Sequence, residues 1–474
     1  MKKVLFFTLF NILTSVFGQS FLKYYQSDCI VYGLNEIDPY FFNHNFSCIA
    51  EKDENILVGG SLYNEEYNKG ALSLTELNTS GGVIENHIIY INGLTGFKIP
   101  LALDWNNGYV YIAGYTGEPE LKNGGAYGFI LKYNYSTKMV VWSKLLVNPQ
   151  VSIFDMKRHP NGNYLICGEV VTPNVGVLYP KGEEAIIYEV NQASGDFSIY
   201  NHSSATTDTE ASDTYLSMTW FNNVLFTVGR HEFASGDSYY YMRPTLTRTN
   251  LSGGALSFHS YIKDLNTYAR LYAVDITNAG GNHLIASYGD YNGIDLKQDL
   301  FATLVNSTGG LLWQRKIEID NEEEDGRFNS CISSFEYTDY NWHHYIHGTY
   351  STSDFVTVVK LNSTGSVEWH KVYENIYSTK AFGTTPNSIL KKNDQIFVVG
   401  WYPAADIFGD KGALLAIDPT GSQPDGCGID IPTLSLNYSF YSSNDLYDYE
   451  YLITNVHSSK SSKPCSLGSE SVCE

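Results

Sequence analysis

Charged residues are scarce in this chain, and positive charge is the scarcer kind. Only 17% of the 474 residues are charged, and 30 Lys and Arg stand against 51 Asp and Glu, which gives a formal net charge of −21. This shortage of positive charge disfavours nucleic acid or an anionic membrane surface as a partner. It leaves a protein or carbohydrate ligand, of unknown identity, as the expected partner.

Long apolar runs are missing after the N-terminus. Residues 1–18 carry Lys2 and Lys3 ahead of the apolar run from Val4 to Phe17, which is the pattern of a secretory signal with a cut before Gln19. No later stretch approaches 18 continuous apolar residues, so we expect no membrane span in the mature chain. The sequence thus predicts a secreted or extracellular protein.

Helical periodicity is absent as well. No segment shows a 3.6-residue apolar period over 11 or more positions. Tyrosine, in contrast, is abundant, with 38 residues, and aromatic residues make up 15% of the chain. A surface built from Tyr, Thr, Ser and Asn is typical of β-rich proteins, so we predict an all-β fold.

A repeat of about 56 residues runs through most of the chain. Seven apolar strands each end in Asn or Asp at a tight turn, and the spacings between these ends are 56, 57, 59, 56, 56 and 56 residues. The ends are Asn78, Asn134, Asn191, Asn250, Asn306, Asn362 and Asp418. Each unit also has an upstream apolar strand that usually closes on a small residue and Gly, such as LVGG at 57–60 and VVGW at 398–401.

Each unit contains four short predicted strands, and seven such units fit a seven-bladed β-propeller of four-stranded antiparallel blades. The segments 356–373 (VTVVKLNSTGSVEWHKVY) and 301–317 (FATLVNSTGGLLWQRKI) resemble the SBBP type of β-propeller repeat. The resemblance covers roughly residues 45–420 and is weaker in units 1, 3 and 4, which lack the Trp of the last strand. It implies a fold and carries no defined reaction and no catalytic residues. Trp142, Trp313 and Trp369 are expected to pack between neighbouring blades.

A propeller ring must close, and the last unit lacks a clear fourth strand because Pro and Gly follow Asp418. Residues 27–33 precede the first LVGG by the distance that would place them as, or beside, the outer strand of the last blade. The predicted organisation is therefore a signal peptide at 1–18, a propeller at 19–440 and a Ser-rich irregular tail at 441–474.

Seven cysteines in an exported chain predict disulfides and leave at least one thiol unpaired within the chain. We expect Cys29 to bond to Cys427 across the seam of the ring, because Cys48 would lie about three strand spacings of about 4.8 Å away. Cys465 and Cys473 are close enough in sequence to pair within the tail. Cys48, Cys167 and Cys331 are expected to stay buried and reduced.

Variation between the units is concentrated in the loops that follow the second strand of each unit. These loops are rich in Tyr and carboxylates, and variable loops on a rigid scaffold are where recognition usually resides. Flat aromatic faces beside carboxylates suit sugars or cationic side chains. The candidate ligand-binding residues are Tyr63, Tyr67, Tyr115, Tyr240, Tyr288, Tyr291, Tyr350, Trp401 and Tyr402.

The leading hypothesis is thus an exported propeller that acts as a binding or scaffold module through these loops. The alternative is a carbohydrate-active hydrolase or lyase with acid and base carboxylates at the channel mouth. No catalytic signature is present, and no catalytic residue or cofactor is predicted. No metal site is predicted either, since His343 and His347 would lie about 13 Å apart on a strand.

Eight Asn-x-Ser/Thr sequons are possible glycosylation sites, although the repeated turn alone would generate most of them. They are Asn45, Asn78, Asn134, Asn201, Asn250, Asn306, Asn362 and Asn437.

Overall fold

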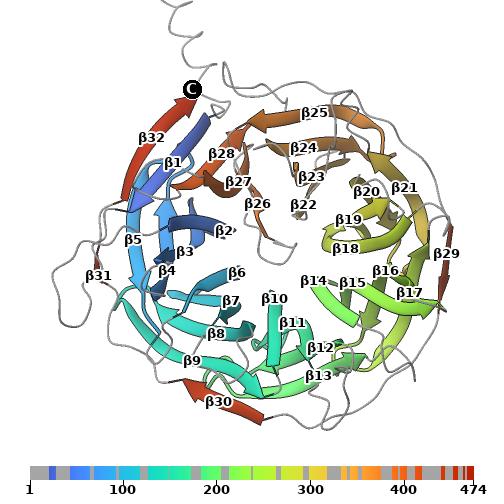
Figure 1. Cartoon of the computed structure of the whole chain (residues 1–474), viewed down its shortest axis with the longest axis horizontal. Coiled ribbons are helices and arrows are strands. Elements are labelled where there is room, and N and C mark those ends of the chain that lie inside the picture. The colour runs from blue at the N-terminus through green and yellow to red at the C-terminus, as the bar shows by residue number, and fades with distance from the viewer. Residues whose placement is uncertain are drawn as a thin grey trace, which may run out of the picture.

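The described part of the chain contains β-strands and turns and no helix. The computed structural model describes residues 21–27, 43–64, 69–91, 96–117, 126–148, 150–171, 183–203, 213–235, 239–262, 268–291, 298–317, 333–338, 342–350, 355–374, 387–392, 395–402, 411–418, 439–442, 452–456, 463–464 and 467–473. The strands form antiparallel sheets arranged around a central axis, which is an all-β propeller (Figure 1). The predicted fold class is therefore confirmed at this level.

Three sheets consist mainly of strands from the first half of the chain, and neighbouring strands in each are antiparallel. The first sheet consists of β2 (Asn43–Lys52), β3 (Asn55–Asn64), β4 (Lys69–Leu77), β5 (Val83–Ile89) and β31 (Lys463–Pro464). The second consists of β6 (Lys98–Asn106), β7 (Tyr109–Gly117), β8 (Ala126–Asn134), β9 (Met139–Asn148) and β30 (Leu452–Val456). The third consists of β10 (Gln150–Arg158), β11 (Tyr164–Val171), β12 (Glu183–Val190) and β13 (Phe197–Ser203).

The remaining strands form three further hydrogen-bonded sheets. One has nine strands, namely β14 (Asp213–Phe221), β15 (Val224–Ser235), β16 (Tyr239–Thr249), β17 (Ala255–Ile262), β18 (Tyr268–Ala279), β19 (Asn282–Tyr291), β20 (Gln298–Val305), β21 (Leu311–Ile317) and β29 (Ser439–Ser442). Another has β22 (Ser333–Thr338), β23 (Trp342–Tyr350), β24 (Phe355–Asn362) and β25 (Val367–Glu374). The last has β26 (Ile389–Lys392), β27 (Gln395–Tyr402), β28 (Lys411–Ile417), β1 (Phe21–Ser27) and β32 (Leu467–Cys473).

The repeated Asn closes the turn between the third and fourth strands of a unit. In the turn after β20, Asn306 Oδ1 accepts hydrogen bonds from the backbone N of Thr308 (2.9 Å), the Thr308 hydroxyl (2.7 Å) and the backbone N of Gly310 (2.8 Å). Gly309 has φ of 83°, in the left-handed region that a β-carbon disfavours. The sequence pattern thus encodes the turn directly, and the predicted strand ends at these positions are confirmed.

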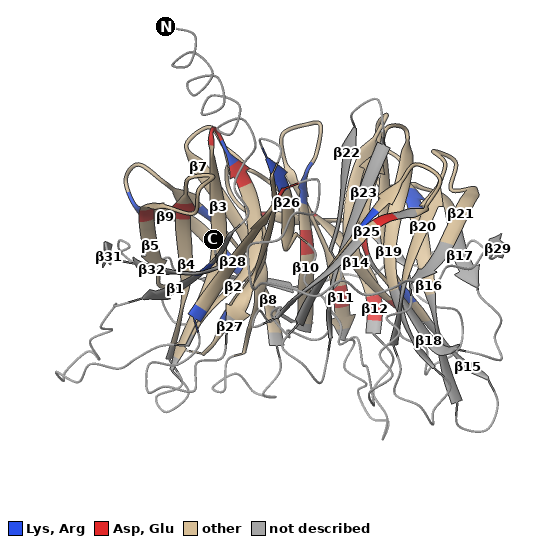
Figure 2. Cartoon of the chain, turned by 90° about the horizontal axis from the view of Figure 1, so that it is seen from above, with Lys and Arg blue, Asp and Glu red and all other residues tan. Residues whose placement is uncertain are grey.

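The two ends of the propeller differ in their connections. The turns within β2–β3, β6–β7 and β10–β11, and the turns that begin at the repeated Asn, lie at the upper end in Figure 2. We call this the turn end. The opposite end, where the second strands terminate at Asn64, Gly117, Val171, Ser235, Tyr291, Tyr350 and Tyr402, is called the loop end.

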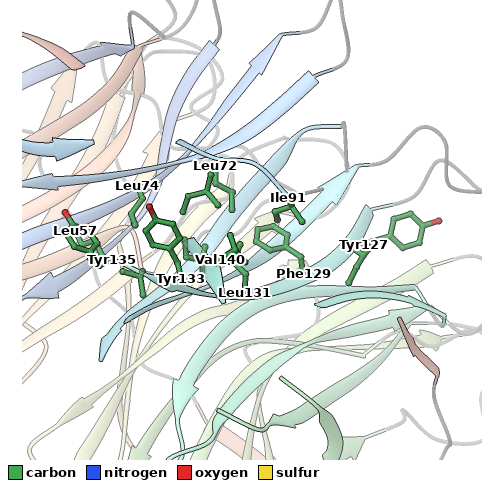
Figure 3. Packing of buried hydrophobic residues seen from close by; sticks show 14 residues of the cluster. Leu57, Leu72, Leu74, Ile91, Tyr127, Phe129, Leu131, Tyr133, Tyr135 and Val140 are labelled. Carbon is green, nitrogen blue, oxygen red and sulfur yellow. The ribbon is translucent and has the colours of Figure 1, made fainter. Parts of the chain in front are cut away.

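The core lies between the faces of neighbouring sheets. Figure 3 shows one such cluster, in which Leu72 and Leu74 of β4 pack with Phe129, Leu131 and Tyr133 of β8. At the periphery, the Trp142 indole donates a hydrogen bond to the carbonyl of Gln192 in the next unit (3.3 Å). Trp313 donates in the same way to the carbonyl of Ser363 (3.1 Å). These two Trp side chains therefore link neighbouring units, as the sequence predicts.

The N-terminal strand lies in the sheet of the last unit, but it is not the segment predicted. Residues 21–27 pair with β28, with Phe21 opposite Ala416 and Tyr25 opposite Gly412. Of the predicted residues 27–33, those after Ser27 lie outside the described residues. The prediction relied on a spacing count, which does not fix the register of an edge strand.

The C-terminal segment, predicted to be irregular, contributes short strands to the outer edges of other sheets. They pair with β17, β9, β5 and β1. Exposed sheet edges offer unpaired backbone groups, so a segment of low intrinsic strand preference can still pair there. The prediction of a wholly irregular tail was therefore wrong for the described parts.

Cys48 and Cys167 are buried free thiols, as predicted, and burial raises the pKa of both. Cys29, Cys331, Cys427 and Cys465 lie outside the described residues. The Cys29–Cys427 and Cys465–Cys473 pairings therefore stay predictions.

Candidate functional site

In five units the second strand carries a small residue, usually Gly, opposite a bulge of the first strand. In the third sheet the register shifts between Ile153 and Asp155, and Gly168 lies opposite Ile153. A β-carbon at Gly168 would overlap with the carbonyl oxygen of Ser152. The same overlap occurs at Gly114 and Gly229. A β-bulge thus explains the Gly at these three positions.

The position after this small residue varies from unit to unit. By sequence and register it is Ser61, Tyr115, Glu169, Arg230, Tyr288, Thr349 and Trp401. A repeat that preserves the backbone and changes this side chain presents a set of different functional groups at one end of the molecule. Two of them, Glu169 and Arg230, are charged and come from neighbouring units.

Glu169 and Arg230 meet across the gap between β11 and the pair β14–β15. The Thr214 hydroxyl donates to Glu169 Oε2 (2.7 Å), and Arg230 Nε donates to the Thr214 hydroxyl (3.2 Å). The Arg230 guanidinium lies 3.5 Å from Glu169 Oε2. The side chain of Glu169 is 13% exposed and that of Arg230 is 24% exposed, so the pair is partly shielded and still reachable from solvent. The Arg230 guanidinium thus places a positive charge beside the Glu169 carboxylate.

A second polar pair lies one residue further along the same strands. His231 Nδ1 and Asp213 Oδ1 are 2.6 Å apart, with side chains 17% and 6% exposed. Because neighbouring residues of a strand point to opposite faces, this pair lies on the other face of the sheet from Thr214 and Arg230. A carboxylate bonded to one ring nitrogen fixes the orientation of an imidazole, which is the arrangement that general acid or base chemistry requires.

Aromatic side chains gather at the same end between the first two sheets. Phe97 contacts Tyr63 edge to face with 5.9 Å between ring centroids, and it contacts Tyr115 in the same way at 6.2 Å. Tyr63 and Phe97 are half-buried, whereas Tyr115 is buried. Tyr63 and Phe97 can therefore offer apolar surface to a ligand.

Tyr115 packs on Leu101, Phe154 and Leu216, which are the bulge residues of three successive first strands. These contacts hold the Tyr115 ring in a buried apolar cluster. Tyr115 is thus a packing residue, and its ring also contacts Phe97.

A buried polar network joins the first strands around the axis. Asp155 accepts hydrogen bonds through both carboxylate oxygens from the backbone N of Met156 and Met218 and from the side chains of Lys157, Ser217 and Asn387. The Ser217 hydroxyl also contacts Asp275 Oδ1 (2.6 Å). Burial alone would lower the pKa of Lys157, but the charges of Asp155 and Asp275 outweigh it and raise the pKa. With five hydrogen-bond donors on its carboxylate, Asp155 links the first strands of neighbouring units and has a structural role.

The structure places the other predicted residues at the loop end of their strands. Tyr288 and Tyr291 lie on β19, Tyr350 on β23, Trp401 and Tyr402 on β27, and Tyr240 at the start of β16. Tyr67 lies outside the described residues. Among the residues described, no group of three or more His, Cys, Asp or Glu side chains is placed to hold a metal ion. Within the same ranges there is no apolar helix long enough to cross a bilayer.

Sequence reasoning missed Glu169, Arg230, Asp213, His231 and Phe97. Glu169 and Arg230 occupy the same position of the repeat as Tyr115, Tyr288 and Trp401, so the repeat position alone would have indicated them. The sequence-based candidates were aromatic residues, which is why these two charged residues were not among them. Asp213 and Phe97 precede or begin first strands, and their contacts depend on three-dimensional pairing.

Comparison with known proteins adds little to this geometry. No protein-family model matches the chain, and no curated protein matches it. Among solved structures, the chain is similar to the GH93 α-L-arabinofuranosidase of Fusarium graminearum in complex with arabinobiose, at 10% identity and a TM-score of 0.42, covering 84% of this chain and 98% of the enzyme.

Two further solved structures are similar at the same level. The polysaccharide lyase Uly1 matches at 10% identity and a TM-score of 0.45, covering 83% of this chain and 92% of the lyase. Extracellular domains 1–2 of Drosophila Semaphorin 1a match at 9% identity and a TM-score of 0.40, covering 82% and 88%. All three TM-scores are below 0.5, so nothing about the site of this chain follows from them.

Proposed function

We propose that this protein is an exported, carbohydrate-active β-propeller that binds a neutral glycan at the loop end and hydrolyses it there. The observation that carries the proposal is the presence of two polar pairs, Glu169–Arg230 and Asp213–His231, on the adjoining strands β11, β14 and β15. The half-buried aromatic rings of Tyr63 and Phe97 belong to the same end. Aromatic faces with a few fixed polar groups are what a sugar-binding surface requires.

Cleavage of a glycosidic bond needs a proton for the leaving oxygen and a base or nucleophile on the other side. In this proposal the substrate lies across the loop end of β14 and β15, because the two pairs are on opposite faces of that sheet. His231, oriented by Asp213, exchanges the proton. Glu169, held in place by Thr214 and Arg230, acts as the base that activates water. The net charge of −21 disfavours a polyanionic substrate, which is why a neutral glycan and hydrolysis are proposed ahead of elimination on an acidic sugar.

A second candidate is glycan binding without turnover. The contacts of Glu169 favour it, since Thr214 and Arg230 already engage the carboxylate oxygen Oε2. A carboxylate held in this way can position a hydroxyl group of a sugar without taking a proton from it.

We also infer that the propeller has seven blades. The strands β14–β17 and β18–β21 each follow the four-strand order of the other units. One parallel residue pair, Met242 with Arg270, joins them into the nine-stranded sheet. Counting them separately, and counting β1 as the fourth strand beside β28, gives seven blades of four strands.

The test is turnover by the full chain on a panel of neutral polysaccharides and aryl glycosides, combined with glycan-array binding. We expect Asp213→Asn and Glu169→Gln each to lower kcat by about 100-fold or more with binding retained. Asp196→Asn is the matched control, since Asp196 is an exposed carboxylate at the turn end that pairs with Lys144. Turnover unchanged in both site variants would refute the catalytic assignment. Binding without any turnover would leave the second candidate.

A further inference from the structure

We propose that four of the turns at the turn end carry N-linked glycans, and that the native turn is built to retain them. The four turns share the pattern Asn-x-Ser/Thr-Gly and begin at Asn78, Asn250, Asn306 and Asn362. This proposal concerns modification and does not depend on the proposed function.

The hydrogen bonds of these turns all use the same atom of the Asn side chain. Asn78 Oδ1 accepts from the backbone N of Ser80 (3.0 Å), the Ser80 hydroxyl (2.7 Å) and the backbone N of Gly82 (2.7 Å). Three equivalent bonds converge on Oδ1 of Asn250, Asn306 and Asn362. N-glycosylation joins the side-chain nitrogen Nδ2 to the anomeric carbon of a lipid-linked sugar donor. The lipid diphosphate leaves, one Nδ2 proton is lost, and Oδ1 keeps its acceptor lone pairs.

The surroundings of Nδ2 also fit an attached sugar. In three of the turns Nδ2 lies next to a Gly, namely Gly82, Gly254 or Gly310. A β-carbon at these positions would lie only 2.7–2.8 Å from Nδ2, so the Gly leaves that side of the nitrogen uncovered. The residue two positions after each Asn is exposed in all four turns, as are Leu251 and Ser363. The glycans would therefore extend into solvent from the turn end and leave the loop end uncovered.

Asn201 supplies the contrasting case within the same chain. It is a sequon on β13, but its residue is only 5% exposed, and its Nδ2 donates a hydrogen bond to the carbonyl of Gly253 in the next unit (2.8 Å). Because the residue is buried, a sugar on this nitrogen would push the side chain out of the gap between the units and so break that bond. Among these five sequons, the structure thus separates four that are compatible with the native fold from one that is not.

The experiment is site mapping on the wild-type full chain secreted from cultured eukaryotic cells. The folded fraction is treated with peptide N-glycosidase in heavy-oxygen water, and conversion of Asn to labelled Asp is read by mass spectrometry. We expect labelling at Asn78, Asn250, Asn306 and Asn362 and none at Asn201. Absence of labelling at these four positions, or labelling of Asn201 in the folded fraction, would overturn the proposal.

A matched pair of variants separates the sugar from the turn. Asn306→Asp keeps the Oδ1 acceptor and cannot be glycosylated, whereas Asn306→Ala loses both. We expect the Asp variant to lose the mass of one glycan with its melting temperature nearly unchanged. The Ala variant should lose the same mass and also melt at a lower temperature. Loss of no glycan mass in either variant would contradict the assignment of this site.

Discussion

The buried histidine at the start of β19 gives the sharpest test of the packing. His283 is fully buried, and its ring stacks on Phe226 with 3.8 Å between centroids and meets Phe221 edge on. Neither ring nitrogen has a hydrogen-bond partner within the described residues. Burial, assisted by the charge of Arg248, lowers the pKa of His283 from 6.5 to about 4.

This pKa makes the free energy of unfolding depend on pH in a defined direction. The unfolded chain binds a proton at His283 near pH 6.5 and the folded chain only near pH 4, so acid favours the unfolded state. The contribution is fully present above pH 6.5 and is lost as the pH falls to about 4. At about 1.4 kcal/mol per pKa unit, the loss is about 3 kcal/mol.

The perturbation is His283→Leu, which keeps an apolar side chain of similar size and removes the proton site. An unfolding entropy of about 2.1 cal/mol/K per residue amounts to about 1 kcal/mol/K for a chain of this length, so about 3 kcal/mol corresponds to about 3 °C. We therefore expect the melting temperature of the wild type to fall by about 3 °C more than that of the variant between pH 7 and pH 4. Differential scanning calorimetry in matched buffers measures it.

Phe226→Leu is the control, because it weakens the packing on the same ring and leaves His283 in place. It should lower the melting temperature at every pH and keep the acid dependence of the wild type. If His283→Leu and wild type lose melting temperature in parallel from pH 7 to pH 4, the reasoning is wrong.

Three other changes test other parts of the structure. Lys52→Met should cost about 3–5 kcal/mol because it leaves Glu76, 2.6 Å from the Lys52 ammonium, buried without its cation, and Glu76→Gln in the same chain should restore part of the loss in urea denaturation. Gly168→Ala should lower the yield of folded protein and the melting temperature sharply, since the new β-carbon overlaps with the carbonyl of Ser152, and normal yield and melting would contradict the bulge. Trp142→Ala should cost about 3–5 kcal/mol by losing its packing and its bond to the next unit, and a loss below about 1 kcal/mol would show that this link is dispensable.

The repeated part of the fold could be predicted from the sequence because its causes are local. In four turns the Asn side chain accepts hydrogen bonds from donors two and four residues later. In the third unit, for example, the Gly of the second strand lies opposite a bulge of the adjacent strand. These Asn and Gly residues recur at a fixed period, so the repeat can be recognised in the sequence. The C-terminal strands could not be predicted, because a Ser-rich segment becomes a strand only when a distant sheet edge supplies its partner.

The sequence indicates where the repeat units differ, but it does not indicate which charged side chains meet there. The sequence indicated the loops after the second strands as the region of greatest variation, and Tyr63 lies at that end with a ring partner, Phe97. The pairing of Glu169 with Arg230 depends on two units being neighbours and on Thr214 lying between them. One aromatic choice, Tyr115, lies in the core because bulge residues from three first strands converge on it.

In this repeat protein, the positions that determine backbone geometry differ from the positions that carry variable functional groups. Positions that every unit needs for its backbone, such as the Gly opposite the bulge, tolerate little change, and the one Ser among the described units, Ser287, is itself small and buried. The next position has no such constraint, so neighbouring units can carry Glu169 and Arg230 on the same backbone geometry. Function in this propeller should therefore be sought where the units differ from one another, at the loop end. The turn end, with its repeated Asn turns, supplies the common frame on which those differences are presented.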